Sequence, residues 1–321
     1  MEPVRCGVWG VGSWGEKHAR VYASLPEAAL AGVYDRDAAR AGAVAAQHRT
    51  RAFESAEALL AACEAVSVAV PTVAHRGAAE RALAAGCHVL VEKPMAAAVA
   101  DAEAMIAAAA AAGRTLQVGQ VERFNPALLA ARGFVREPKF IEAHRLAPFQ
   151  PRSLDIDVVS DLMIHDLDAV LQITGQVPVE VSAVGVAVLS SAEDIANARL
   201  EFADGCVANL TASRVSVERL RRIRFFTRDA YVSVDLFDKA GEAFVIQDPG
   251  SFRPGHADPL ALLAGIRRTR LEVEPGEPLA LELRAFLRSL RGGGGGAASA
   301  AAGRDALAVA EQVRAAMRRR A

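Results

Sequence analysis

The chain has 321 residues, enough for two domains of ordinary size that each bury their own core. Its composition, 52% hydrophobic and 23% charged, is that of a soluble globular protein. The formal net charge of −1 argues against a nucleic-acid-binding surface spread over the chain, so we expect no nucleic-acid partner.

The cysteines and the apolar runs argue against two further classes of protein. The four cysteines are scattered without the spacing of metal ligands, which predicts reduced structural thiols and no metal site. The N-terminus has no signal-like pattern, and no run of about 18 strongly apolar residues follows. We therefore expect no membrane insertion and a cytoplasmic protein.

A glycine-rich turn follows the first apolar run. VRCGVWG leads into GVGSWG, residues 10–15, after which the sequence takes up helical spacing. Gly10 permits a tight turn, Gly12 lets the backbone approach a pyrophosphate, and Gly15 lets the helix pack close to the strand. The N-terminus of that helix would offer N–H groups and a positive dipole to the phosphates.

An acidic residue stands where a dinucleotide site needs one. A second apolar run, ALAGVY, ends at Asp35, which we expect to accept hydrogen bonds from the adenosine ribose. A 2′-phosphate would meet like charge there, so NAD is favoured over NADP, although Arg36 could turn toward a phosphate. Ser13 and Trp14, in the glycine-rich turn, are also expected to contact the cofactor.

The first part of the chain alternates strand and helix. Six strands are expected, at residues 4–10, 29–34, 50–53, 65–70, 88–94 and 115–119, with helices between them. This alternation predicts a doubly wound parallel sheet whose ligand lies beyond the carboxyl ends of the strands.

Two of these strand ends carry polar side chains. Lys93 follows Glu92 after the apolar run HVLV, beside the expected position of a nicotinamide, where it could donate to a substrate oxygen or be merely solvated. Pro71 and Thr72 end another strand. Thr72 could cap the next helix, with His75 in its first turn, or these residues could contact the cofactor.

The run VVSDLMIHDLDAVL, residues 158–171, places polar side chains on one narrow helical stripe. The stripe holds Asp157, Asp161, His165, Asp168 and Gln172, and most other positions are apolar. A solvated surface face is one explanation; a buried helix with a polar seam along a cleft is the other, because a surface helix has a broader polar face.

The remaining runs predict an α+β domain with a large, mostly antiparallel open sheet. Strands are expected within the runs 138–146, 179–190, 197–205, 206–214, 221–237 and 242–247, with short turns such as ADG (203–205) and RDA (228–230). A helix at 279–290, a flexible low-complexity loop at 291–303 and a last helix from 304 complete the chain. One face of the sheet would need cover, which predicts a homo-oligomer, a dimer or tetramer, formed through this sheet.

The motifs GVGSWG, AVPTVAH, VLVEKP, VGQVERFNP and DLMIHDLD, in this order, resemble the Gfo/Idh/MocA family of sugar and cyclitol dehydrogenases. The resemblance extends from Val4 to the C-terminal helix and implies a Rossmann domain at residues 1–119. A substrate-binding and oligomerisation domain follows at 120–321. It also implies NAD or NADP as cofactor and a catalytic group of Lys93, Asp161 and His165.

The sequence departs from the family pattern where Ser160 and Met163 replace frequent glycines, which leaves the shape of the pocket open. In one assignment His165, with an ordinary pKa of about 6.5, takes the hydroxyl proton while Lys93 stabilises the alkoxide. In the other, Lys93 is the base and His165 a donor. Asp161, at i−4 to His165, would orient the ring or bind the sugar.

The substrate is expected to be a sugar, and several polar residues flank the presumed pocket. They are Arg123, Asn125, Arg145, Arg152 and Arg214, and arginines suit a phosphorylated substrate. ERFNPA and LTASR resemble the nucleotide-sugar branch of the family. This implies oxidation of a UDP-sugar such as UDP-N-acetylglucosamine at its 3-position, ahead of an amination in lipid A precursor synthesis.

Three alternatives to that substrate and activity stay open. One is a dehydrogenase of a free sugar or inositol. The second is an NAD-dependent glycoside hydrolase, and the third is a non-catalytic NAD-binding regulator. The intact Lys93, Asp161 and His165 count against the regulator.

Overall fold

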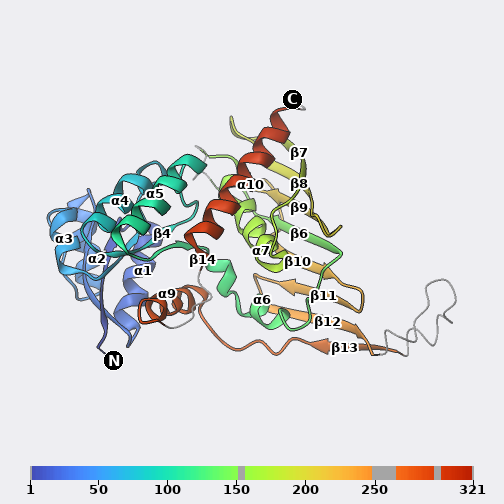
Figure 1. Cartoon of the computed structure of the whole chain (residues 1–321), viewed down its shortest axis with the longest axis horizontal. Helices are drawn as coiled ribbons and strands as arrows, with labels where there is room; N and C mark the ends of the chain where they lie inside the picture. Colours follow the sequence, from blue (N-terminus) through green and yellow to red (C-terminus); the bar gives the residue numbers. More distant parts are fainter. Residues whose placement is uncertain (1, 151–155, 248–264, 293–297, 320–321) are drawn as a thin grey trace. The chain divides into compact units, whose positions relative to one another are not determined.

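The computed structural model describes residues 2–150, 156–247, 265–292 and 298–319 (Figure 1). The chain forms two compact units, Met1–Phe124 with Glu277–Leu307, and Asn125–Gly276 with Ala308–Ala321. The sequence suggested a single division at residue 119, whereas in the structure Glu277–Leu307 also belongs to the first unit.

The first unit is built on a six-stranded sheet with the order β14-β5-β4-β3-β1-β2. Five strands are parallel and β14 runs antiparallel to β5. The strands are β1 (Val4–Trp9), β2 (Ala28–Tyr34), β3 (Ala65–Val68), β4 (His88–Glu92), β5 (Leu116–Gly119) and β14 (Ala298–Ser299). The predicted parallel sheet is therefore confirmed.

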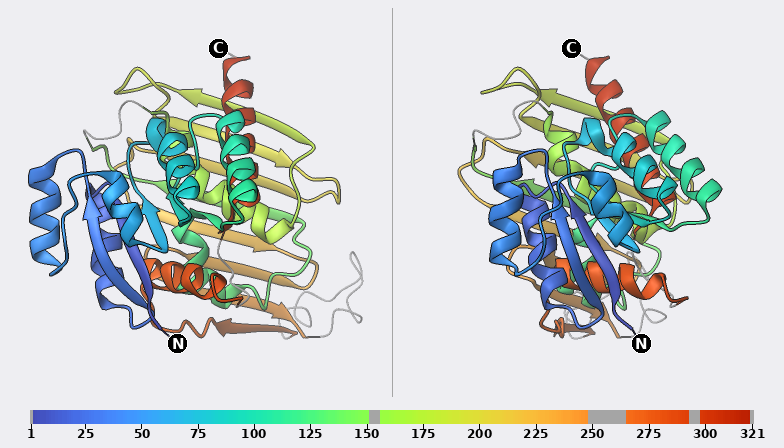
Figure 2. Two further views of the ribbon diagram at one scale, coloured as in Figure 1. Left: turned by 60° about the vertical axis from the view of Figure 1, so that its left-hand side comes forward. Right: turned by 90° about the vertical axis from the view of Figure 1, so that its left-hand side faces the viewer.

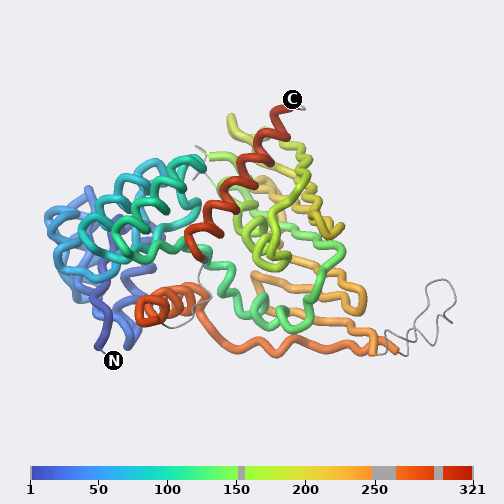
Figure 3. Tube along the Cα trace, in the orientation of Figure 1, coloured from blue at the N-terminus to red at the C-terminus, as the bar shows by residue number. Residues whose placement is uncertain are grey.

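Helices cover both faces of this sheet, because its central strands are buried on both sides. One face packs against α3 (Ala56–Ala62), α4 (His75–Ala84), α5 (Val99–Ala112) and the start of α10 (Ala300–Arg318). The other packs against α1 (Ser13–Ser24), α2 (Ala38–Gln47) and α9 (Pro278–Ser289). The chain trace in Figure 3 shows the orange-red α9 returning to lie beside the blue α1.

Two of the predicted elements of this unit are wrong. Residues 50–53 form no strand; only an isolated bridge joins Ala52 to Val33. The loop predicted at 291–303 ends early, since Ala298–Ser299 pair with β5 and α10 begins at Ala300. Residues 293–297 lie outside the described part of the chain.

The second unit is built on an eight-stranded sheet with the order β13-β12-β11-β10-β6-β9-β8-β7 (Figures 1 and 2). Its neighbours are antiparallel except for β6 and β9, which are parallel. The strands are β6 (Phe140–Leu146), β7 (Glu180–Val186), β8 (Ile195–Glu201), β9 (Val207–Ser213), β10 (Leu220–Phe226), β11 (Ala230–Asp235), β12 (Ala240–Ile246) and β13 (Ile266–Arg270). The mostly antiparallel sheet is as predicted, and β13 is an addition.

Helices cover one face of this second sheet. They are α6 (Pro126–Ala131), a π-helical turn (Val159–Met163) that continues into α7 (Ile164–Thr174), and the second part of α10. The strand residues that face them are buried, whereas alternate residues point to the opposite face. Among the described helices of both units, none is long and apolar enough to cross a membrane.

Candidate functional site

The glycine-rich turn has the geometry that the sequence predicted. Gly10 has φ +88°, and a Cβ there would lie 2.8 Å from the backbone of Ala69. A Cβ at Gly15 would overlap the carbonyl oxygen of Gly10, so α1 packs against β1 as closely as backbone allows. A Cβ at Gly12 would meet no atom within 4 Å, which leaves room for a ligand beside the backbone.

The start of α1 is suited to bind an anion. Gly12 caps the helix without a side-chain hydrogen bond, so its first N–H groups remain available for phosphate. Ser13 and Trp14 are exposed there, and Lys17 Nζ lies 4.4 Å from the centre of the Trp14 ring. The residues present therefore fit a bound pyrophosphate.

Asp35 follows β2 and holds the turn in place. Its Oδ2 accepts a hydrogen bond of 2.8 Å from the N–H of Val11, and its Oδ1 accepts one of 2.9 Å from Asp37. Arg40 approaches both carboxylate oxygens at 3.5 Å, while Arg36 is exposed. The carboxylate thus stands at the strand end where a ribose would bind, as NAD requires.

Lys93 follows β4 in a half-buried position, and buried polar groups hold the residue before it. Glu92 Oε2 accepts the N–H of Lys93 at 3.2 Å, and Oε1 lies 2.9 Å from His18 Nε2. His18 Nδ1 lies 3.0 Å from Ser67 Oγ, which also bonds the hydroxyl of Tyr22 at 2.9 Å. This network joins α1, β3 and β4 directly behind Lys93.

Sequence reasoning missed His18, because its partners lie on strands far along the chain and nothing in the local pattern of α1 distinguishes it. The imidazole is 1% exposed, so its two hydrogen bonds are shielded from water.

His75 holds the residue after Lys93. Its Nδ1 lies 3.0 Å from the carbonyl oxygen of Pro94 and its Nε2 lies 2.9 Å from that of Val70. Burial lowers the pKa of His75, and the two carbonyl hydrogen bonds partly offset this effect. The predicted cofactor contact of His75 stays a prediction; its visible role is to tie two strand ends together.

The predicted cap at Thr72 is wrong. A 3₁₀ turn (Thr72–Ala74) precedes α4, and the caps of both elements, Pro71 and Ala74, make no side-chain hydrogen bond. Pro71 is exposed and Thr72 half-buried at the end of the strand segment.

In the second unit, a π-helical turn carries Asp161 and leads into His165. Residues 163–170 are all buried, which supports the polar seam over the solvated face. Asp157 stabilises the start of the turn, since its carboxylate accepts the N–H groups of Val159 and Ser160 at 2.9 Å. π-helical turns are rare in proteins, and those that occur are often found at functional sites.

Asp161 is half-exposed and lines a hollow of about 190 Å³ at one end of the sheet. The hollow is lined by Ala147, Pro148, Gln150, Asp161, Leu162, Arg214, Arg219 and Arg221. Sequence reasoning included Arg214 but missed Arg219 and Arg221, which only the pairing of β10 with β6 brings to this place.

Two predicted substrate-binding arginines have internal partners in the structure. Arg145 forms a two-pronged ion pair with Asp166, at 2.9 and 2.8 Å, and is 2% exposed. Arg214 binds Asp194 at 2.8 Å and the carbonyl of Ile156 at 2.7 Å.

Asn125 caps α6, accepting the N–H of Ala127 at 3.1 Å, and donates to the carbonyl of Leu236 at 2.8 Å. Arg123 is buried in a 3₁₀ turn (Val121–Phe124) of the first unit. Arg152 lies outside the described residues. A substrate contact by Arg123, Asn125, Arg145 or Arg214 stays a prediction, and the geometry of Arg145 and Asn125 favours a structural role.

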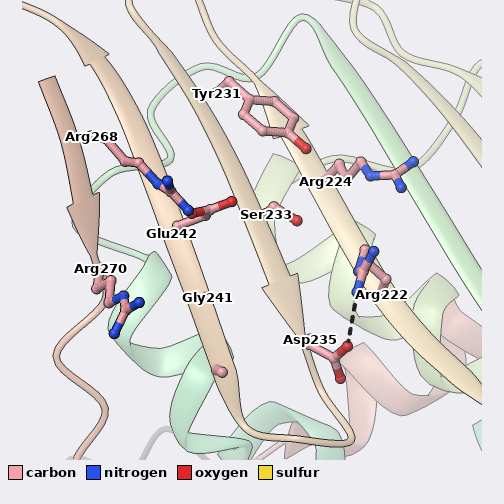
Figure 4. Close-up of a pocket in the computed structure, with 10 residues that line it drawn as sticks. Arg222, Arg224, Tyr231, Ser233, Asp235, Gly241, Glu242, Arg268 and Arg270 are labelled. Atoms are coloured by element: carbon pink, nitrogen blue, oxygen red, sulfur yellow. Dashed lines mark hydrogen bonds and ion pairs between the residues drawn. The ribbon is translucent and has the colours of Figure 1, made fainter. Parts of the chain in front are cut away.

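A larger hollow, of about 500 Å³, lies on the opposite face of the same sheet (Figure 4). Arg222, Arg224, Arg268 and Arg270 line it together with Tyr231, Ser233, Asp235, Ala240, Gly241 and Glu242. Arg222 pairs with Asp235 at 3.2 Å and Arg224 with Glu142 at 2.6 Å. It holds neither Asp161 nor His165, so it is separate from the candidate active site.

The described residues offer few other reactive groups. No cluster of three metal-ligating side chains occurs within the described ranges. The four cysteines are free thiols, and burial raises the pKa of Cys63 to about 12, so that this thiol stays protonated.

Comparison with known proteins gives consistent relatives. Residues 4–120 match the Gfo/Idh/MocA oxidoreductase family with its NAD-binding Rossmann fold, and residues 131–233 match the C-terminal domain of the same family. UDP-N-acetylglucosamine 3-dehydrogenase from Acidithiobacillus ferrooxidans is 43% identical, over 99% of this chain and 98% of its own length. A solved structure of that enzyme superposes with a TM-score of 0.89, at 42% identity and 98% coverage of both chains.

An inositol 2-dehydrogenase from Rubrobacter xylanophilus is 34% identical, over only 52% of this chain and 51% of its own. The chain therefore belongs to the Gfo/Idh/MocA family of oxidoreductases, with an NAD-binding Rossmann domain at its N-terminal end.

Proposed function

We propose that the protein oxidises the 3-hydroxyl of UDP-N-acetylglucosamine with NAD, giving the 3-keto sugar, NADH and a proton. The observation that carries this proposal is the likeness to the Acidithiobacillus ferrooxidans enzyme, which extends over 99% of the chain. The inositol dehydrogenase from Rubrobacter xylanophilus matches only 52% of it, which makes a free polyol the weaker candidate.

We assign catalysis to Lys93, Asp161 and His165, the group that the family resemblance implies. Bound NAD supplies the nicotinamide C4 that accepts the hydride from the sugar carbon. His165 takes the proton of the reacting hydroxyl, and the role of the Lys93 ammonium is to stabilise the developing oxyanion. Asp161, which faces the arginine-lined hollow, binds the sugar or orients His165.

The exchange of roles, with Lys93 as the base, is distinguished by pH. The profile of kcat/KM reports the essential base of the free enzyme. His165→Gln should abolish the acidic limb if His165 is the base, whereas Lys93→Met should abolish it if Lys93 is.

The activity is tested by following absorbance at 340 nm with NAD and a panel of UDP-sugars, free sugars, sugar phosphates and inositols. We expect stoichiometric NADH formation with UDP-N-acetylglucosamine. Activity on a free polyol with none on any UDP-sugar would contradict the substrate. Sugar cleavage without NADH would indicate the hydrolase, and NAD binding with no turnover on any compound would indicate the regulator.

We also propose a homo-oligomer in which the open face of the eight-stranded sheet packs against a second copy. This face carries a row of aromatic rings on neighbouring strands, with centroids 5.7, 5.0 and 5.7 Å apart. The row consists of Phe140, Phe226, Tyr231 and Phe244. Beside it, arginines and acids alternate in the hollow of Figure 4, a pattern that a two-fold related copy could complement.

Light scattering after size exclusion tests the oligomer. Tyr231→Asp should shift the mass toward the monomer because it buries a charge among the rings, while Arg228→Ala, in an exposed turn of the same sheet, should not. A monomeric wild type at micromolar concentration would refute the interface.

We further propose that the reaction takes place in the cytoplasm and precedes an amination. The free thiols suit the reducing cytoplasm, and cell fractionation would test that location. A 3-keto sugar is a substrate for amination, as the resemblance to the lipid A precursor branch implies. A coupled assay with a purified aminotransferase and an amino donor should yield the 3-amino sugar; no amine product would contradict this role.

A further inference from the structure

We propose that Arg219 and Arg221 form the subsite for the diphosphate of the substrate, and that this pair selects nucleoside diphosphate sugars over free sugars and polyols. The inference rests on the proposed function, because it extends the site of Asp161. The juxtaposition that carries it is the hollow in which Asp161 shares a wall with three arginines.

The charge of the hollow favours an anion. Its lining holds Arg214, Arg219 and Arg221 against one carboxylate, Asp161. Arg214 is held 2.8 Å from the buried carboxylate of Asp194, so its charge is offset inside the protein. Arg219 and Arg221 add two guanidinium groups to the described lining, and a diphosphate offers phosphate oxygens to both. A neutral polyol offers these guanidinium groups no phosphate oxygen.

The direction of the Arg221 side chain follows from the strand. Arg221 is the second residue of β10, and strand alternation places its side chain on one side of the sheet. Arg219 directly precedes the strand and lines the same hollow. For Arg221 that is the helix-covered side, since Ile223 and Phe225, next in the alternation, are fully buried. Arg221 therefore ends a row of core residues, where a guanidinium is accommodated because the hollow opens beside it.

Arg219 is more exposed and is positioned by an aromatic ring. Its guanidinium carbon lies 5.8 Å from the ring centre of Phe237, which is 49% exposed. Guanidinium groups bind phosphate oxygens with two parallel hydrogen bonds, a geometry that an ammonium cannot reproduce. The pair thus offers forked donors to a diphosphate whose sugar reaches Asp161.

Binding of UDP tests the subsite without turnover. Calorimetry with UDP, on the NAD-bound protein, should show affinity reduced about 10- to 100-fold in Arg219→Ala and in Arg221→Ala, because each removes a charged hydrogen-bonding pair. Arg228→Ala removes the same charge beyond the far end of β10 and should bind UDP as the wild type does. Uridine, which has no phosphate, should bind equally to all four proteins.

Arg221→Lys keeps the charge and should lie between wild type and Arg221→Ala, which also guards against a variant that fails to fold. In turnover, both alanine variants should raise the KM for UDP-N-acetylglucosamine with kcat little changed. Unchanged UDP affinity in both alanine variants would overturn the subsite, as would an equal loss of uridine binding.

The two proposals can fail separately. Arginine-dependent UDP binding without oxidation of UDP-N-acetylglucosamine would refute the proposed function and keep the subsite. Oxidation with an unchanged KM in both variants would do the reverse.

Discussion

The ion pair between Arg145 and Asp166 joins strand β6 to helix α7, next to His165, and removing one partner should reveal its role. The two side chains are 2% and 4% exposed and meet at 2.8 and 2.9 Å. Asp166→Ala leaves a buried guanidinium without its carboxylate, which costs about 3–5 kcal/mol. For a unit of this size the thermal midpoint should fall by about 6–20 °C.

The paired replacement separates structure from substrate binding. Arg145→Met with Asp166→Leu removes both charges and should be close to neutral in stability, since apolar residues of similar size replace buried ion pairs well. Its KM for UDP-N-acetylglucosamine should stay near the wild-type value if Arg145 is structural. Urea denaturation measures the first quantity and initial rates the second.

An exposed pair provides the matched control. Arg199 and Glu201 form an ion pair in which the side chains are 45% and 42% exposed. Glu201→Ala breaks this pair and should lower the free energy of unfolding by less than about 1 kcal/mol. The reasoning fails if Asp166→Ala costs no more than Glu201→Ala, or if the double variant is stable but binds the sugar much more weakly.

Three further predictions concern other parts of the chain. Gly15→Ala should weaken NAD binding at least ten-fold, about 1.4 kcal/mol, because the added Cβ would overlap Gly10. Gly42→Ala, which has open space around the added Cβ, should bind NAD as the wild type does. Fluorescence titration with NADH measures both variants, and equal affinities would contradict the prediction for Gly15. Burial opposes ionisation of Asp194, but hydrogen bonds from Arg214 and backbone N–H groups outweigh it and lower its pKa, so this carboxylate stabilises the fold above about pH 4 and less as pH falls further. Asp194→Asn should therefore lose stability in urea at pH 7 and a smaller but still substantial amount at pH 3, because only the part of the contribution between the ordinary carboxyl pKa and pH 3 has disappeared; an equal loss at both values would refute this. His18→Gln should lower kcat and shift the pH profile with little change in KM, since it displaces Glu92 behind Lys93; a loss of stability alone would make the residue merely structural.

Local sequence patterns predicted the geometry of the glycine-rich turn and of the strand end at Asp35. The glycine-rich turn and Asp35 are constrained by backbone sterics and by a single strand end, so neighbouring residues reveal them. Residues 50–53 were misjudged because a short apolar run resembles a strand whether or not a partner is available. The strand β14 was hidden inside a low-complexity stretch, where composition says nothing of pairing.

The site residues that sequence reasoning missed depend on contacts between distant segments. His18 has partners 49 and 74 residues away. Arg145 was singled out in the sequence, but its carboxylate partner lies on another element, so its structural pairing was hidden. Arg219 and Arg221 reach Asp161 only through the register of β10 against β6. The π turn is equally hidden, because a helical wheel assumes one constant period through Asp161 and His165.

Transfer of deuterium from the sugar to the cofactor tests the central claim most directly. UDP-N-acetylglucosamine carrying deuterium at C3 is incubated with the protein and NAD, and the reduced cofactor is isolated and analysed by mass spectrometry. The account predicts one deuterium in each reduced nicotinamide and a 3-keto sugar without it. Deuterium retained at C3 while NADH forms would place the oxidation at another carbon, and no reduction of NAD would contradict the proposed activity.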